Sequence, residues 1–167
     1  DRLIKSIGKY YQKFDKKSKK IIFNIVGDGE EEIFKLKELS KKYNIEKNII
    51  FHGKKIKYEL EKIYECSDIG VDSLARHRTG NNYNSSLKSK EYIAYGIPLI
   101  KSHIDDSLDK NKFIYNVTSD ENIFEIDDII KWYEKEKFDK NKLCNYAFEN
   151  MIWNIQIKKI LERLNWR

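Results

Sequence analysis

The sequence predicts an α/β fold with an open, mostly parallel sheet that is followed by a helical tail. Short apolar runs alternate along the chain with segments whose apolar residues recur at helical spacing. This alternation is typical of parallel strands joined by right-handed helical crossovers. The length of 167 residues fits one domain with its own core, because domains of about 100 to 200 residues bury most of their apolar surface. We therefore expect residues 1–167 to form one domain.

Five apolar runs are predicted to be strands. The first is apolar except for one asparagine and is followed by Gly27 and Gly29, as expected of a buried parallel strand that enters a tight turn. The second strand ends before Gly53. The predicted strands are residues 21–26, 48–52, 69–74, 98–101 and 113–117.

Helical spacing predicts the remaining elements. Helices are expected at residues 30–43, at residues 56–66, before Gly96, and in several segments from residue 127 onward. Within the last of these, Trp153 and its apolar neighbours are expected in the core or at an interface. The first residues already have helical spacing, with Asp1 as an N-cap, so we expect the chain to be a piece of a longer protein.

Composition narrows the classes of function. Lys and Arg number 33 against 27 Asp and Glu, a net charge of +6, but the lysines are interleaved with glutamate, so charge alone does not favour nucleic-acid binding. Cys66 and Cys144 stand singly, which indicates neither a zinc site nor a disulfide framework and fits a reducing, cytoplasmic setting. No apolar run approaches the roughly 18 residues that span a bilayer. The sequence has no P-loop, no hydrolase order of Ser, Asp and His, and no metal-ligand spacing, so no metal is expected.

Two glycine-containing turns follow predicted strands. Gly27 and Gly29 lie where a strand leads into a helix, so their backbone N–H groups could face a ligand. Glycine is also the least strained residue for such a turn. His52 and Gly53 have the same position one crossover later, where a histidine can equally be a capping or packing residue.

The polar loop at residues 75–83 is more informative. Arg76, His77 and Arg78 follow the third predicted strand and could clamp an anionic group, because arginine is suited to bidentate contacts with phosphate. A solvated basic loop is the alternative interpretation.

The stretch at residues 84–100 has the parts of a phosphate-binding helix start. Ser85 and Ser86 precede the helix and Lys88 adds a positive charge. Glu91 lies within one turn of that start, where its carboxylate could accept hydrogen bonds from sugar hydroxyls. A glutamate in a first turn is also an ordinary capping residue.

Taken in order, these motifs resemble the C-terminal donor-binding domain of GT-B glycosyltransferases of family 4, the glycosyl transferases group 1. The series covers residues 21 to about 159 and consists of VGDG after a strand, NIIFHG, SD before IGVDSL, KEYIAYGIPLI, and MIWN in a late helix. The resemblance implies a Rossmann-like half of a GT-B fold that binds a nucleotide sugar, such as a UDP- or GDP-sugar, at the carboxyl ends of its strands. It also implies sugar transfer with retention of configuration and without a metal or cofactor.

The resemblance implies a role for Glu91. This residue matches the second of the family's two glutamates, which holds the ribose hydroxyls of the donor nucleotide. Eight positions earlier, where the family has its first glutamate, this chain has Tyr83. The other donor-site residues implied are Ser85, Ser86 and Leu87 at the diphosphate, Gly27 and Gly29 on the cleft floor, and His52 and Gly53 near the base. No catalytic residue is assigned.

Bacterial polysaccharide-type relatives are more similar still, with a His-Arg-Gly loop and a Ser-Leu-Lys-Ser run before the retained glutamate. Arg76, His77, Arg78 and Lys88 are then candidates to replace the missing contacts. We therefore expect the donor-binding half of an enzyme that makes capsule, O-antigen or another surface polysaccharide.

Family members also have a first strand of this domain and an N-terminal acceptor domain, both of which would lie before Asp1. A glycan or lipid-linked acceptor would bind through that missing domain, so the fragment alone should not catalyse transfer. We expect a cytoplasmic protein that can also contact the inner face of the cell membrane peripherally. We expect no nucleic-acid partner. The competing interpretation is a non-enzymatic α/β nucleotide-binding or signalling module.

Overall fold

Helices and strands alternate along the chain in the predicted order. The computed structural model describes residues 1–13, 15 and 18–164. In chain order the elements are α1 (Arg2–Gln12), β1 (Phe23–Val26), α2 (Glu30–Lys42), a 3-10 turn (Glu46–Asn48), β2 (Ile49–Gly53), α3 (Lys57–Glu65), β3 (Gly70–Val71), a second 3-10 turn (Arg76–Thr79), α4 (Leu87–Ala94), β4 (Leu99–Lys101), β5 (Ile114–Asn116), α5 (Ile126–Glu136), α6 (Lys140–Asn150) and α7 (Trp153–Arg163).

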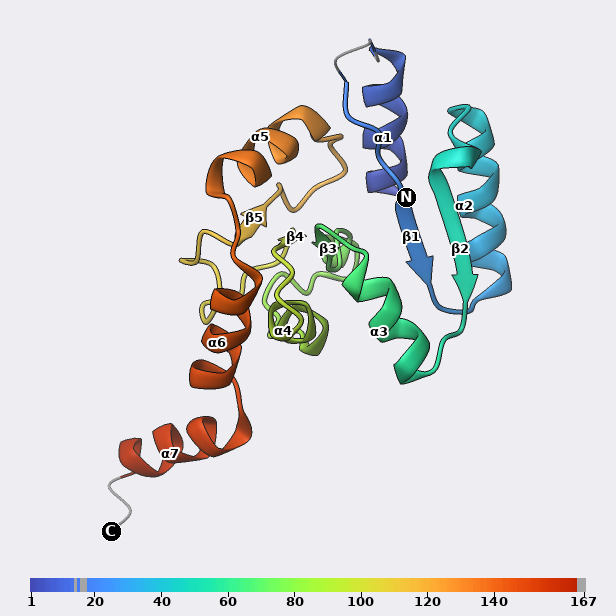
Figure 1. Ribbon diagram of the computed structural model, residues 1–167. Helices are drawn as coiled ribbons and strands as arrows, with labels where there is room; N and C mark the ends of the chain where they lie inside the picture. The colour runs from blue at the N-terminus through green and yellow to red at the C-terminus, as the bar shows by residue number, and fades with distance from the viewer. Residues whose placement is uncertain (14, 16–17, 165–167) are drawn as a thin grey trace.

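The strands form two parallel sheets. In the described residues β1 pairs with β2, and a separate sheet has the order β3-β4-β5. Every pairing is parallel, with Phe23 opposite Ile49 in the first sheet and Gly70 opposite Leu99 in the second. Figure 1 shows β1 and β2 side by side next to α2, with the three shorter strands apart from them. The α/β class with parallel strands is confirmed, whereas the expected continuity of one sheet is not observed.

Four of the described strands, β1, β3, β4 and β5, are shorter than the apolar runs that predict them, and hydrogen bonds accompany the early start or end of two of these runs. Ile21 lies in the first run, but its N–H donates to the Tyr11 hydroxyl (2.8 Å) and its carbonyl accepts from the Asn48 amide (2.9 Å). These side-chain bonds replace a strand ladder, so β1 begins at Phe23. The run at residues 69–74 gives only the two residues of β3; beyond it the N–H of Ser73 donates to the Asp72 carboxylate (2.6 Å) and not to a strand.

Helix α1 closes one apolar core. Its buried face consists of Leu3, Ile4, Ile7 and Tyr10, which recur at helical spacing. Next to them the buried guanidinium of Arg2 donates to the carbonyls of Leu74 (2.6 Å) and Asn122 (2.9 Å). These bonds join the start of α1 to the loops that follow β3 and β5.

A second core lies between α4, β4, β5 and α6. Its buried residues are Ile93, Leu99, Leu108, Phe113, Ile114, Leu143 and Ala147. Gly96 ends α4 with a positive φ of 74°, a conformation that favours glycine. A Cβ atom at this position would lie 2.7 Å from the carbonyl oxygen of Lys140. The glycine therefore permits both the turn and the close approach of α6.

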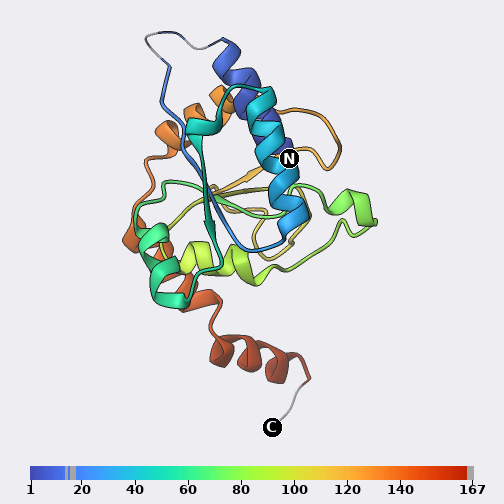
Figure 2. The same cartoon turned by 90° about the vertical axis from the view of Figure 1, so that its right-hand side faces the viewer.

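The last helix, α7, extends away from the rest of the molecule in both views (Figures 1 and 2). Trp153 at its start is 77% exposed, so it is not a core residue of the described chain. One face of the helix carries further exposed apolar side chains at helical spacing, namely Ile157, Ile160, Leu161 and Leu164. The interface role predicted for Trp153 therefore stays a prediction. Among the described residues, no helix combines the length and apolarity that a membrane crossing requires.

Candidate functional site

The candidate site lies where β3 and β4 end and α4 begins. Ser86 is the N-cap of α4 and has an extended backbone, but its side chain makes no capping hydrogen bond. The hydroxyl of Ser89, in the first turn, donates instead to the carboxylate of Asp72, directly after β3. The start of α4 is thus attached to the carboxyl end of a strand, the edge at which α/β proteins commonly bind ligands.

Asp72 is a buried, ionised carboxylate. Burial opposes ionisation, but hydrogen bonds from Ser89, from Ser86 and from the N–H of Ser73 outweigh it, so the pKa of Asp72 lies below its usual value. The positive charge of Lys88 acts in the same direction. From the sequence Asp72 was expected within a strand, and its role as a buried acceptor was not predicted. The sequence signal that could have revealed this role is an acidic residue directly after the apolar residues 69–71.

Other buried polar groups surround this carboxylate. The Nε2 atom of His103 lies 3.9 Å from Asp72 Oδ2, and neither ring nitrogen has a hydrogen-bond partner among the described residues. Burial lowers the pKa of His103, so the imidazole is neutral at pH 7. Lys101, fully buried at the end of β4, pairs with Asp109. Within the described residues, no group of three or more His, Cys, Asp or Glu side chains is arranged as a metal site.

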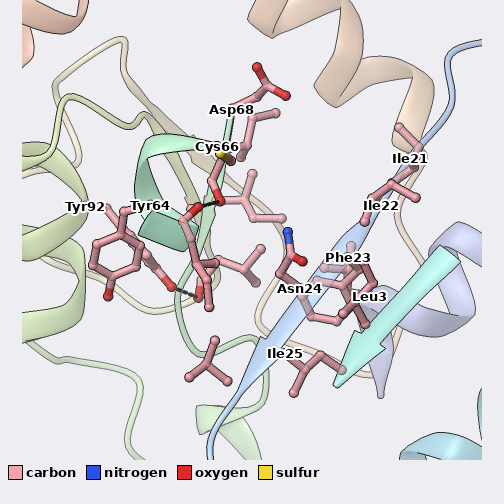
Figure 3. A pocket seen from close by; sticks show the side chains of 18 of the residues that line it. Leu3, Ile21, Ile22, Phe23, Asn24, Ile25, Tyr64, Cys66, Asp68 and Tyr92 are labelled. Carbon is pink, nitrogen blue, oxygen red and sulfur yellow. Dashed lines mark hydrogen bonds between the residues drawn. The ribbon is translucent and has the colours of Figure 1, made fainter. Parts of the chain in front are cut away.

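Lys88 and Glu91 line a large cavity. This inter-sheet cavity of about 890 Å³ lies between residues 21–26, which include β1, and residues 66–71, which include β3. Figure 3 shows side chains of β1 on one side of it and Tyr64 and Tyr92 on the other. Burial, together with the negative charge of Glu91 and a hydrogen bond to it, raises the pKa of Tyr64. A cation and a carboxylate therefore face one space beside the start of α4.

The basic loop has acidic partners. The guanidinium of Arg78 donates from Nε and Nη2 to the two oxygens of Glu121, each at 2.6 Å, and from Nη2 to Asp1 (2.8 Å). His77 lies 2.7 Å from the same Glu121 carboxylate. Hydrogen bonds from Arg78 and His77 lower the pKa of Glu121 to about 2. Arg78, which we expected to clamp phosphate, is thus bonded to the carboxylate of Glu121. It does not line the inter-sheet cavity.

The glycine turns lie at the carboxyl ends of β1 and β2. Gly27 follows β1, and its N–H donates to the carbonyl of Gly53 (3.0 Å), the last residue of β2. His52 is hydrogen-bonded through Nε2 to the side chain of Asn24 on the neighbouring strand (2.8 Å), which is a packing contact within the sheet. None of Gly27, Gly29, His52 and Gly53 lines the inter-sheet cavity.

The residues around the α4 start differ in exposure. Ser85 accepts a hydrogen bond from Lys90 (2.6 Å), and Ser86 is buried. Leu87 is 74% exposed and Tyr83 is 68% exposed. Tyr83 forms an isolated parallel bridge with Ile104, which positions its backbone beside the loop after β4. Its side chain therefore stands in solvent.

Comparison with protein families agrees with this arrangement. A family model described as "Glycosyl transferases group 1" matches residues 1–126. The chain belongs to this family. The match contains all five strands and the α4 site, whereas α6 and α7 lie outside it. No individual curated protein matches the chain significantly.

Family membership supports a general role for the chain in glycosyl transfer, with a sugar donor and an acceptor as partners. The α/β structure with parallel strands is consistent with one half of a GT-B fold. Of the predicted donor-site residues, Leu87, Lys88 and Glu91 lie on the first turns of α4, with Ser86 as the N-cap and Ser85 just before it. The structure does not bring Arg78, the glycine turns or His52 to the same cavity.

Proposed function

We propose that this chain is the donor-binding domain of a retaining glycosyltransferase whose donor is a nucleotide sugar. The observation that carries the proposal is that Lys88 and Glu91 both line one cavity, beside the N-terminus of α4. A carboxylate can accept hydrogen bonds from both ribose hydroxyls, and an ammonium group together with free helix N–H groups suits a diphosphate. The ribose and the diphosphate of a nucleotide sugar thus have complementary partners on one helix.

Within this proposal each residue has a distinct chemical task. Glu91 binds the ribose, while the backbone amides of residues 85–87 and the Lys88 ammonium bind the diphosphate. As the bond between sugar and diphosphate breaks, negative charge grows on the departing phosphate oxygens. Lys88 and the helix N-terminus stabilise that charge without moving. We expect the donor to bind without a cofactor or a metal.

Calorimetric titration with UDP, GDP and the free nucleosides tests the ribose assignment. Replacing Glu91 with Gln should weaken binding of nucleotide and nucleoside alike by about 10- to 100-fold, because a charge-assisted hydrogen bond contributes about 1.5 to 3 kcal/mol. The matched control is Glu149→Gln, at an exposed position on α6, which should bind as the parent does. Unchanged affinity in Glu91→Gln would refute the assignment.

The diphosphate assignment needs a different comparison. Lys88→Ala should weaken diphosphate binding and leave nucleoside binding unchanged, and the loss should shrink as salt is raised. Arg78→Ala tests the alternative clamp, in which Arg78 exchanges Glu121 for phosphate. The control is Lys110→Ala, at another exposed position. Equal effects on diphosphate and nucleoside would contradict a phosphate role.

We further propose that the complete enzyme acts in the synthesis of capsule, O-antigen or another surface polysaccharide. The support is the likeness of the basic loop and of the Ser-Leu-Lys-Ser run to bacterial enzymes of that type. Its acceptor would be a glycan or a lipid-linked glycan held by an N-terminal domain, and the protein would be cytoplasmic with peripheral contact at the membrane. The 167 residues alone should then bind donor without transferring sugar. Binding of a DNA duplex but of no nucleotide would instead favour a nucleic-acid role.

A further inference from the structure

The proposed ribose ligand, Glu91, has an exposed side chain on α4. A glutamate side chain has several rotatable bonds, and a ligand that immobilises such a side chain loses affinity in doing so. A carboxylate that is already held in one orientation avoids that loss. The groups that contact Glu91 in the free protein therefore bear on how well it can bind a ribose.

Three tyrosines pack together between α3 and α4. The ring of Tyr64, on α3, lies against the rings of Tyr92 and Tyr95, on α4, with centroid distances of 5.4 and 5.0 Å. These distances are typical of favourable aromatic pairs. Tyr64 is only 9% exposed, and Figure 3 shows it on the same side of the inter-sheet cavity as Tyr92. The ring of Tyr64 thus has a fixed place beside α4.

The hydroxyl groups of the two α4 tyrosines have partners other than Glu91. Tyr92 donates to the carbonyl of Val71 on β3 (3.2 Å), and a Cβ atom at Gly70 would lie 2.5 Å from its ring. The ring therefore rests directly on the backbone of β3. Tyr95 donates to the carboxylate of Glu61 on α3 (2.7 Å). These contacts join α3, α4 and β3 around the ring of Tyr64.

The hydroxyl of Tyr64 faces Glu91. Glu91 precedes Tyr95 by four residues, so the two side chains share one face of α4, and Tyr64 packs against that face. Tyr64 and Glu91 also line the same cavity. Burial, the negative charge of Glu91 and a hydrogen bond to it raise the pKa of Tyr64. The phenol is therefore protonated at pH 7, and its O–H donates to the carboxylate.

We propose that Tyr64 is a positioning residue that orients the Glu91 carboxylate toward the ribose of the donor nucleotide. This inference rests on the proposed function and extends it to a residue on a second helix. A carboxylate has about four lone-pair sites, so the Tyr64 O–H occupies one and leaves others for the 2′ and 3′ hydroxyls. Because neighbouring rings hold Tyr64, the carboxylate is oriented before the nucleotide binds. The site should thereby select ribonucleotides over 2′-deoxyribonucleotides.

Titration of the Tyr64 phenol by NMR tests the contact without any nucleotide. In Glu91→Gln the pKa of Tyr64 should fall toward the ordinary value of about 10 and stay above it, because burial of the ring remains. The matched control is Glu61→Gln, which removes the partner of Tyr95 and should leave the pKa of Tyr64 as it is in the parent. An unchanged pKa of Tyr64 in Glu91→Gln would overturn the proposal.

Calorimetry with UDP, GDP and their 2′-deoxy counterparts tests the positioning role. The parent should bind its preferred ribonucleotide about 10-fold or more tightly than the 2′-deoxy form, as expected of a hydrogen bond to a charged group. Tyr64→Phe keeps the ring and should bind that ribonucleotide about 2- to 10-fold more weakly, with most of the discrimination lost. Tyr95→Phe removes a hydroxyl from the same cluster and should keep both affinity and discrimination.

The possible results separate this proposal from the proposed function. If Tyr64→Phe weakens the ribose and 2′-deoxyribose forms equally, Tyr64 has only a packing role and the proposal is wrong. If Glu91→Gln loses affinity while Tyr64→Phe keeps both affinity and discrimination, the positioning role alone fails. If Glu91→Gln binds every nucleotide as the parent does, the ribose assignment of Glu91 fails, and the role of Tyr64 fails with it.

Discussion

The Asp72 carboxylate offers the sharpest test of how the candidate site is held together. Asp72→Asn keeps the shape of the side chain but removes its charge and one of its acceptors. The Ser89 hydroxyl, fully buried, then loses an ionised acceptor. A hydrogen bond to a charged group contributes about 1.5 to 3 kcal/mol, and a buried polar group left without a partner costs about 1 to 3 kcal/mol. Ser86 also bonds to Asp72, so we expect a loss of about 3 kcal/mol in the free energy of unfolding at pH 7.

Urea and thermal unfolding measure this loss. For a chain of this length about 3 kcal/mol corresponds to a Tm lower by roughly 6 to 12 °C. The matched control is Asp106→Asn, an exposed aspartate in the loop after β4, which should change stability by no more than about 0.5 kcal/mol. In a double-mutant cycle, Ser89→Ala should be coupled to Asp72→Asn, because the two residues share one hydrogen bond.

The pH dependence gives a second, independent test. The pKa of Asp72 is lower in the folded protein than its ordinary value, so its contribution is fully present above the unfolded pKa of about 3.9. The contribution is lost as the pH falls through the folded pKa. The difference in stability between the parent and Asp72→Asn should therefore be constant from pH 7 to pH 5 and shrink below about pH 4. A variant as stable as Asp106→Asn at pH 7 would refute the reasoning.

Two further predictions concern other contacts. Glu121 should titrate with a pKa of about 2 in an NMR experiment, and Arg78→Ala should move that pKa toward the ordinary value because the strongest hydrogen-bond donor is removed; an unchanged pKa would contradict the pairing. Gly96→Ala should be less stable than Gly53→Ala by about 1 to 3 kcal/mol in urea unfolding. Both glycines have positive φ, but only at Gly96 would the new Cβ approach the Lys140 carbonyl, at 2.7 Å. Equal stabilities would show that α6 moves aside.

Much of the fold follows from local patterns in the sequence. Apolar periodicity located the described helices to within a few residues, because helical amphipathicity is a property of neighbours along the chain. The strand at residues 69–74 was predicted too long, since periodicity does not reveal that the N–H of Ser73 bonds to the Asp72 side chain and not to a neighbouring strand. The split into two sheets was not predicted for the described chain, because strand pairing depends on contacts between distant segments.

The site was predictable to a smaller extent. The start of α4 was recognised from its polar run, and Lys88 and Glu91 do share a cavity. The partner of Arg78 in the basic loop could not be predicted from local sequence, because Glu121 is 43 residues away; the phosphate role of this loop stays a prediction. His103 and Lys101 were missed for the same reason. Their burial depends on the pairing of β3 with β4. No local sequence motif predicts that pairing.

The ionised Asp72 also constrains how an anion can bind at this site. The N-terminus of a helix attracts negative charge, but here the Asp72 carboxylate, directly after β3, already lies at that position and accepts a hydrogen bond from the Ser89 hydroxyl. A diphosphate placed beside it meets both the favourable helix dipole and the repulsion of Asp72. The ammonium of Lys88, whose charge acts on Asp72, offsets that repulsion. Lys88 should therefore matter more for diphosphate affinity than Ser85, and Lys88→Ala should weaken UDP binding much more than Ser85→Ala does. The reverse order in calorimetry would place the diphosphate away from Asp72, toward the serine side of the helix start.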